Sequence, residues 1–282
     1  ERYPESAIWQ FNAGAINSKL NRLDEAIVHL QKCVSLKYSG VRTFEENIDL
    51  DPLRDRDEFK AILEQVRSNA KGRMDEFQRE ARAHVPESYV PPVVSDETRP
   101  LVIALHGTGM DGESMLKAMQ DTAKEKQLIL ICPDALRPAG DGFSWTYRDE
   151  AEWFVNHLID NAVREHNADP EQVILVGFSQ GANIALIMAQ TQPDRFIGVV
   201  PICGHYESQI ARASTVPAPT YLMTGARDPW KRTYSDAQRD FMDAGGRVLL
   251  RVLSGRGHML PTGSSGKREY SRAVQWVLDQ YP

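Results

Sequence analysis

Three residue types that together perform nucleophilic chemistry occur in this chain directly after apolar runs. The first, Ser179, lies in Gly-Phe-Ser-Gln-Gly at 177–181, between a β-branched run at 173–176 and a helix-forming run at 182–186. A strand-to-helix turn of this kind holds a serine with its hydroxyl outward, and the flanking glycines leave room that Cβ atoms would fill. The pattern predicts a nucleophilic serine, against the simpler alternative of a glycine-rich packing turn.

An acid and a base follow the serine along the chain. Asp228 and His258 each lie in a loop directly after an apolar run that is typical of a buried strand. All three residues are therefore expected at the carboxyl edge of one sheet, where open α/β sheets bind their ligands. A lone loop aspartate or histidine is more often structural, so the prediction rests on the three together. Asp134 and Asp149 precede the serine and are poorer candidates for the acid.

A glycine-rich loop supplies a fourth chemical element. His-Gly-Thr-Gly at 106–109 follows a short apolar run at 101–105. Glycines let backbone amides approach a ligand closely, and two fixed N–H donors can stabilise the negative oxygen of a tetrahedral intermediate. Loss of one such donor typically costs about 2.7–4 kcal/mol of barrier. We assign the donors to the backbones of Thr108 and Gln180, and expect His106 to shape the loop rather than carry a proton.

Together these motifs resemble the serine esterases of the α/β-hydrolase superfamily, near the phospholipase/carboxylesterase and dienelactone-hydrolase-like families. The similarity extends from about residue 99 to the end of the chain. The motifs that carry it are 106–109, Cys-Pro-Asp-Ala at 132–135, Ser144-Trp145, 177–181, Gly-Ala-Arg-Asp-Pro at 225–229 and Gly257-His258. The order serine, aspartate, histidine is the one expected of this superfamily. The resemblance implies ester hydrolysis through an acyl-enzyme on Ser179, with His258 as general base and Asp228 as the acid that orients it.

The sequence also departs from these families. After Ser144-Trp145 it continues Thr-Tyr-Arg-Asp, where the carboxylesterase branch usually has Phe-Asp, so the pocket shape is left open. The dienelactone branch usually has a cysteine nucleophile, and Ser179 at that position favours an ordinary ester. A thioesterase or peptidase with the same triad, or a catalytically silent hydrolase fold used as an interaction module, remain the alternatives. Trp145, His205 and Trp230 are candidate substrate contacts, although loop packing is the favoured explanation for each of them alone.

Helical and apolar segments alternate in this part of the chain. Alternation of this kind predicts an α/β fold with a mostly parallel sheet and helices on both faces. We expect a catalytic domain over 101–282. Its helices are expected at 114–126, 151–167, 182–190, 234–244 and 268–280, with strands beginning near 101, 128, 173, 196, 220 and 248.

Residues 1–85 are of a different kind, rich in Glu, Arg, Ala and Leu at helical spacing. Residues 12–34 resemble one tetratricopeptide (TPR) unit, with Gly14 and Ala26 at its small-residue positions, although Asn17 and Tyr38 depart from the usual Tyr and Pro. A second helical pair is expected, with a break at 51–55 and a helix at 58–68. One repeat cannot bury its own faces. These helices therefore either dock on the hydrolase or continue a longer array. Covering apolar hydrolase surface and binding a protein partner are equally weighted as their role.

Residues 86–100, with four prolines, are expected to form a linker that also supplies an edge strand from Tyr89, Val90, Val93 and Val94. No metal-ligand spacing or dinucleotide fingerprint occurs in the sequence, so we expect no metal and no cofactor. Three cysteines are too few, and odd in number, for a disulfide framework.

The composition indicates an ordinary soluble enzyme, and the resemblance implies a small-molecule ester as its substrate. The net charge of −6 gives no sign of nucleic-acid binding, and no apolar run approaches the ~18–20 residues that cross a membrane. The chain starts at Glu1 without methionine or a signal segment. Its compartment is left open, with a cytoplasmic location slightly favoured over a processed or exported form.

Overall fold

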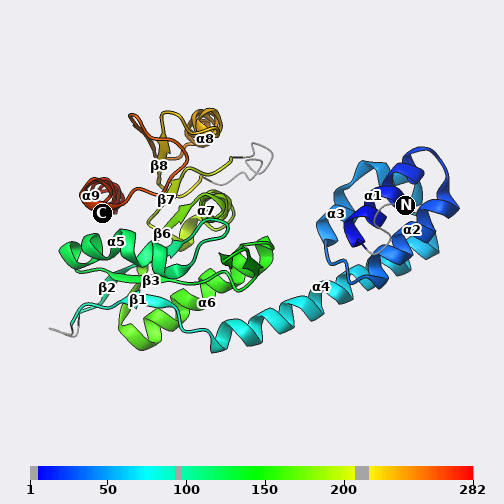
Figure 1. Cartoon of the computed structure of the whole chain (residues 1–282), viewed down its shortest axis with the longest axis horizontal. Helices are drawn as coiled ribbons and strands as arrows, with labels where there is room; N and C mark the ends of the chain where they lie inside the picture. Colours follow the sequence, from blue (N-terminus) through cyan, green and yellow to red (C-terminus); the bar gives the residue numbers. More distant parts are fainter. Residues whose placement is uncertain (1–5, 93–96, 207–215, 282) are drawn as a thin grey trace. The chain divides into compact units, whose positions relative to one another are not determined.

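The computed structural model describes residues 6–92, 97–206 and 216–281, and the chain divides into two compact units, Glu1–Arg82 and Ala83–Pro282 (Figure 1). Across the described residues, no helix combines the length and the apolar character that a membrane crossing requires.

The first unit opens with a helical hairpin. Helices α1 (Ala7–Lys19) and α2 (Leu23–Ser35) pack closely against each other. At Gly14 a Cβ would lie 2.6 Å from Leu30 Cδ2 and 3.3 Å from the carbonyl oxygen of Ala26. The close approach of the helices therefore depends on the absence of a side chain at this position. The relation of this hairpin to TPR units stays a prediction.

The rest of the first unit is α3 (Val41–Glu46), a 3₁₀ turn η1 (Ile48–Leu53) and the long helix α4 (Asp57–Ala83). The turn η1 occupies the expected break and contains Pro52. The helix expected at 58–68 continues for fifteen more residues, to Ala83. The core of this unit is built from buried side chains that include Phe11, Leu30, Phe44, Leu53 and Phe59.

The second unit is built on a seven-stranded sheet in the order β1-β3-β2-β6-β7-β8-β9. Strand β1 pairs antiparallel to β3, and every other neighbouring pair is parallel. The strands are β1 (Glu87–Tyr89), β2 (Arg99–Leu105), β3 (Ile129–Cys132), β6 (Ala168–Phe178), β7 (Gly198–Ile202), β8 (Thr220–Gly225) and β9 (Val248–Leu253). The predicted edge strand is thus β1, which ends before Val90, whereas Val93 and Val94 lie outside the described residues.

Helices cover both faces of this sheet (Figure 1). On one face α5 and α9 pack against each other, and on the other α6 and α7 do so, while α8 packs along β8 and β9. Alternate strand residues such as Val102, Ala104, Ile174 and Val176 join one core with α5 and α9, as the period of two in a strand requires. The helices are α5 (Gly112–Lys126), α6 (Arg148–His166), α7 (Gln180–Thr191), α8 (Lys231–Asp243) and α9 (Gly263–Leu278).

The predicted fold class of a mostly parallel sheet with helices on both faces is confirmed, with helix limits that differ by a few residues. Two details were not expected. A turn η2 (Pro193–Arg195) delays the strand expected near 196 until Gly198. A small hairpin of β4 (Pro138–Ala139) and β5 (Gly142–Phe143) also lies beside the glycine-rich loop: Gly109 N donates to Phe143 O at 2.8 Å, and Phe143 N donates to Met110 O at 2.9 Å.

Candidate active site

Ser179 occupies the turn between β6 and α7 in a strained backbone conformation. Its φ of 52° and ψ of −112° are rare for a residue with a side chain. The backbone N–H of Ser179 donates to Ile202 O at 2.9 Å, which ties the turn to the end of β7. The helix that begins at Gln180 directs its free N–H groups toward the same place.

The two glycines of this turn have no room for side chains. A Cβ on Gly177 would lie 2.2 Å from the carbonyl oxygen of Gly181, and a Cβ on Gly181 would lie 2.5 Å from that of Leu105. Both obstacles are backbone atoms, which cannot rotate away. The close packing of β6, α7 and β2 around Ser179 therefore requires glycine at both positions.

His258 lies between Ser179 and Asp228, in hydrogen-bonding distance of both. Its Nδ1 is 2.9 Å from Asp228 Oδ2, and its Nε2 is 3.0 Å from Ser179 Oγ. Because a carboxylate only accepts, Nδ1 carries the proton; Nε2 of the neutral ring then accepts from the serine hydroxyl. The Asp228 side chain is fully buried, and its Oδ1 accepts from Trp230 N at 2.8 Å. The arrangement can transfer the serine proton to the imidazole and stabilise the resulting charge.

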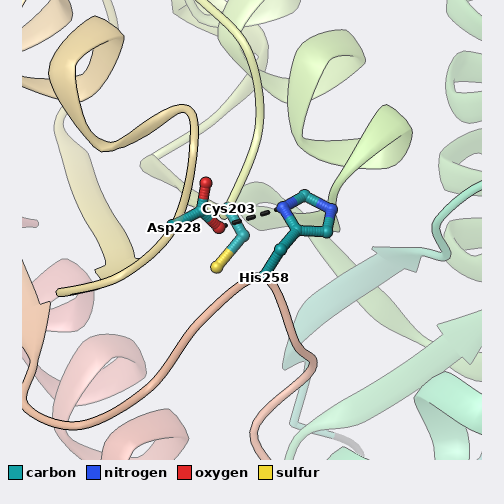
Figure 2. Close-up of side chains that lie close together, drawn as sticks. All are labelled: Cys203, Asp228 and His258. Atoms are coloured by element: carbon teal, nitrogen blue, oxygen red, sulfur yellow. Dashed lines mark hydrogen bonds and ion pairs between the residues drawn. The ribbon is translucent and has the colours of Figure 1, made fainter.

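Cys203 lies next to the Asp228 carboxylate and the His258 ring (Figure 2). Burial, together with its hydrogen bond to Asp228, raises the pKa of this thiol to about 12, so it stays protonated and donates to the carboxylate. The sequence indicated only a small core residue here. Ligand atoms of these three residues lie within 4.8 Å of one another, a spacing that could hold a metal ion. The hydrogen bonds to Asp228 already account for the cluster.

His106, at the start of the glycine-rich loop, is fully buried. Ala135 N donates to its Nε2 at 3.1 Å, which leaves the proton on Nδ1, 2.7 Å from Gly107 O. Burial lowers the pKa of this histidine, so the ring is held neutral in one tautomer. This geometry suits a side chain that shapes the loop.

The loop runs beside the nucleophile, since the Cβ position of Gly107 is 3.1 Å from Ser179 Cβ. Thr108 and Gln180 are in contact through their side chains: Thr108 Oγ1 donates to Gln180 Oε1 at 3.0 Å. Within the described part of the chain, the backbone N–H groups of Thr108 and Gln180 have no hydrogen-bond acceptor. Two free donors therefore flank Ser179.

The three candidate substrate contacts have different environments. Trp145 is buried, 4% exposed, and its Nε1 donates to His106 O at 3.0 Å, so it packs beneath the loop. His205 and Trp230 pack edge to face with ring centroids 4.6 Å apart, and Trp230 is 43% exposed. The backbone N–H of His205 is held by Asn183 Oδ1 at 2.7 Å.

Other polar residues of the site were missed at the sequence level or set aside. Asp134 accepts from Gly112 N at 2.8 Å and so holds the start of α5, away from His258. The hydroxyl oxygen of Tyr234, which the sequence did not single out, accepts from Gly204 N at 2.6 Å, beside Cys203. The side chain of Gln180 was also missed, because the sequence motif assigns only its backbone. No pattern in a single sequence identifies such contacts between distant segments.

A comparison with known families agrees with this architecture. A family model described as alpha/beta hydrolase fold matches residues 100–271, more than half of the 282 residues. The chain belongs to the alpha/beta hydrolase fold family.

Relatives of this alpha/beta hydrolase include a protein named as a putative esterase and one named as a depolymerase. It is 31% identical over 149 residues to the putative esterase NocK of Nocardia uniformis subsp. tsuyamanensis, covering 47% of this chain and 41% of that protein. It is 31% identical over 119 residues to poly(3-hydroxyalkanoate) depolymerase C of Paucimonas lemoignei, covering 37% of this chain and 28% of that protein. The chain thus spans less than half the length of these two relatives.

Solved structures show the same fold. The crystal structure of esterase PE8 superposes with a TM-score of 0.58 at 21% identity, covering 69% of this chain and all of that one. At this identity the likeness concerns the fold of the alpha/beta hydrolase unit.

Proposed function

We propose that this protein is a serine esterase that hydrolyses carboxylic esters through an acyl-enzyme on Ser179. The observation that carries the proposal is the continuous hydrogen-bonded chain from Ser179 Oγ to His258 and from His258 to the buried Asp228 carboxylate, at 3.0 and 2.9 Å. A serine hydroxyl is a weak nucleophile at neutral pH, and an imidazole held in this tautomer is the base that activates it.

In the first half-reaction Ser179 Oγ attacks the ester carbonyl carbon while its proton moves to His258 Nε2. The negative oxygen of the tetrahedral intermediate accepts from the N–H groups of Thr108 and Gln180. As the carbon–oxygen bond to the alcohol breaks, His258 returns the proton to the alcohol. Water then attacks the acyl carbon, again losing a proton to His258, and the acid is released with Ser179 restored.

Esters are the favoured substrate class for two reasons. The proposed nucleophile is a serine, and the chain is similar to a putative esterase and to a poly(3-hydroxyalkanoate) depolymerase. A thioester or a peptide would pass through the same tetrahedral intermediate, so the triad alone does not separate these substrates. In this proposal Trp230 and His205 contact the acyl or the alcohol part of the ester, and Trp145 supports the loop at 106–109.

Labelling by a fluorophosphonate probe tests the proposal. We expect an adduct on Ser179, identified by peptide mass spectrometry, that is absent in Ser179→Ala and blocked by an ester substrate. Hydrolysis of p-nitrophenyl esters of increasing acyl length, beside a thioester and a peptide, then ranks the substrate classes. Absence of both labelling and hydrolysis in the folded wild-type protein would instead support a catalytically silent interaction module.

We further propose that the two compact units are the functional domains, a TPR-like helical domain and the hydrolase. The close approach of α1 and α2 at Gly14 supports the first assignment. Exposed apolar residues on these helices, Ile16, Leu20 and Val28, favour a protein partner as the role of this domain.

A further inference from the structure

The side chain amide of Gln180 makes four hydrogen bonds next to the nucleophile. Its Oε1 accepts from Trp145 N at 2.8 Å, from Thr108 Oγ1 at 3.0 Å and from Ser144 Oγ at 3.1 Å. Its Nε2 donates to Trp145 O at 3.3 Å. An amide oxygen has two lone pairs, so these three donors leave it no free accepting position. The side chain is therefore held in one position by two separate segments of the chain.

Those two segments are themselves linked to each other. Trp145 Nε1 donates to His106 O at 3.0 Å, and Gly109 N donates to Phe143 O at 2.8 Å. The loop at 106–109 is thus tied to the segment at 143–145, and Gln180 ties both of them to the first residue of α7. The three segments form a closed hydrogen-bonded ring that includes both residues proposed to donate to the oxyanion, Thr108 and Gln180.

The chemistry of an amide suits this location. It can accept from hydroxyl and N–H donors and also donate to a carbonyl, which a hydrophobic side chain cannot do. It does so without charge, whereas a carboxylate would repel a negative oxygen forming beside it. An oxyanion hole is effective only when its donors are fixed before the reaction, because reorganising them during the reaction raises the barrier.

We propose that the Gln180 side chain is a positioning group that fixes the separation of the two oxyanion donors, the backbone N–H groups of Thr108 and Gln180. This inference rests on the esterase function proposed above. It assigns to the side chain of this residue a role separate from that of its backbone: the side chain acts through Thr108 and Trp145.

Gln180→Met tests the role, since methionine has a similar length and shape but cannot make the four hydrogen bonds. Because a misplacement of about 1 Å can cost 10²-fold, we expect kcat to fall by about 10–100-fold. The Michaelis constant should change by less than about threefold, since the ring supports the transition state rather than the bound ester. Gln275→Met is the matched control: the side chain of this exposed glutamine of α9 is hydrogen-bonded to Lys126 and Asp279, and its replacement should leave kcat unchanged.

Thr108 provides a second, independent measurement. Thr108→Val removes one hydrogen bond to Oε1, and a net loss of about 1 kcal/mol predicts a kcat lowered about fivefold. Thr108→Ser keeps the hydroxyl and should recover most of the kcat that Thr108→Val loses. In the Gln180→Met background, Thr108→Val should have almost no further effect, because its partner atom is already gone. Effects that multiply would show that the two side chains act independently, and would overturn the proposal.

A boronic acid inhibitor, which forms a tetrahedral adduct on the serine, separates failure of this inference from failure of the esterase assignment. If the inference holds, its inhibition constant rises in Gln180→Met by the same factor as kcat/KM falls, with the fluorophosphonate still labelling Ser179. Unchanged boronate binding and unchanged kcat in a folded Gln180→Met would overturn the positioning role while leaving the esterase intact. A wild-type protein that is neither labelled nor active would overturn both.

Discussion

The role of Asp228 in the proposed triad can be measured with a substitution that preserves the shape of the side chain. In Asp228→Asn the side chain keeps its shape, but its NH₂ group donates to His258 Nδ1 and forces the ring proton onto Nε2. The imidazole then cannot accept the serine proton, and a loss of about 10⁴-fold in kcat is expected from the equivalent change in a known triad. Hydrolysis of p-nitrophenyl acetate measures it.

Asp134→Asn is the matched control for that variant. Its amide oxygen can still accept from Gly112 N, so the hydrogen bond that holds the start of α5 is kept. We therefore expect kcat to stay within about threefold of wild type. A large loss of kcat in Asp134→Asn with little loss in Asp228→Asn would show that Asp134, and not Asp228, is the acid, and would contradict the proposed triad.

The buried His106 ring makes the free energy of unfolding depend on pH. Burial lowers its pKa in the folded protein, against the opposing effects of the hydrogen bond to Gly107 and of the charges of Asp134 and Asp111, while an unfolded histidine has a pKa near 6.5. The unfolded chain therefore binds more protons below about pH 6.5, and the free energy of unfolding falls as the pH drops from 7 toward 5. Above pH 7 both states are neutral and this contribution is constant.

Denaturant unfolding between pH 5 and 8 measures the effect, with His106→Gln as the comparison. The variant is expected to be less stable at pH 8, where it loses two hydrogen bonds, but its stability should fall less steeply toward pH 5. Carboxylates with lowered pKa values, such as Asp111 and Glu269, lose their contribution only below about pH 4.5, outside this window. Parallel pH curves for the two proteins would refute the assignment.

Single residues also show which parts of the site could be predicted from the sequence. Ser179, Asp228 and His258 could be singled out because each follows an apolar run, and parallel strands bring their carboxyl ends to one edge. The Gln180 side chain and the Cys203 thiol could not, because their partners, Trp145 and Asp228, lie in loops whose positions in the fold are not fixed by one sequence. Catalytic roles for all of these residues stay predictions.

The turn from β6 to α7 is the element on which the site most depends. In Gly181→Ala the new Cβ would collide with the carbonyl oxygen of Leu105 at 2.5 Å, so β2 and α7 would have to separate. We expect a loss of about 1–3 kcal/mol in the free energy of unfolding, as for overpacked cores. Activity should fall further than stability does, because α7 carries the N–H of Gln180. Thermal unfolding and ester hydrolysis measure the two effects.

Gly72→Ala is the control for glycine replacement itself. Gly72 lies in α4, and a Cβ there would meet no atom within 4 Å. Alanine is the better helix former by about 0.5–1 kcal/mol, so this variant should be as stable as wild type or more so, with unchanged activity. If Gly181→Ala behaved in the same way, the turn would not be as tightly packed as its distances indicate.

The helices and strands could be predicted to the extent that their apolar period was long and regular. The alternating elements of the hydrolase unit satisfy that condition, and their order and type were predicted. Helix α4 was predicted too short, because Asn69 and Gly72 are poor helix formers. In the folded chain Asn69 Nδ2 donates to Val34 O and Tyr38 O, both at 3.0 Å, so contacts with the end of α2 favour continuation of the helix through this point. The two-residue strands β4 and β5 carry no period at all.

The two compact units have separate hydrophobic cores. The buried core residues of the first lie between 11 and 66, and those of the sheet unit that pack on α5 and α9 lie between 102 and 277. Every residue assigned to the proposed site, from Thr108 to His258, belongs to the second unit. A unit with its own core can fold alone in principle.

We therefore expect a chain of residues 71–282 to be soluble and to hydrolyse p-nitrophenyl esters with kcat/KM within about threefold of the full protein, because both the core and the site remain complete. Ser179→Ala in the shortened chain gives the background rate. An insoluble product, or a soluble one without labelling at Ser179, would mean that residues 1–70 cover apolar surface that the hydrolase needs buried. Full activity would show that residues 1–70 take no part in catalysis. Substitution of the exposed residues Ile16, Leu20 and Val28 should then abolish partner binding and leave ester hydrolysis unchanged.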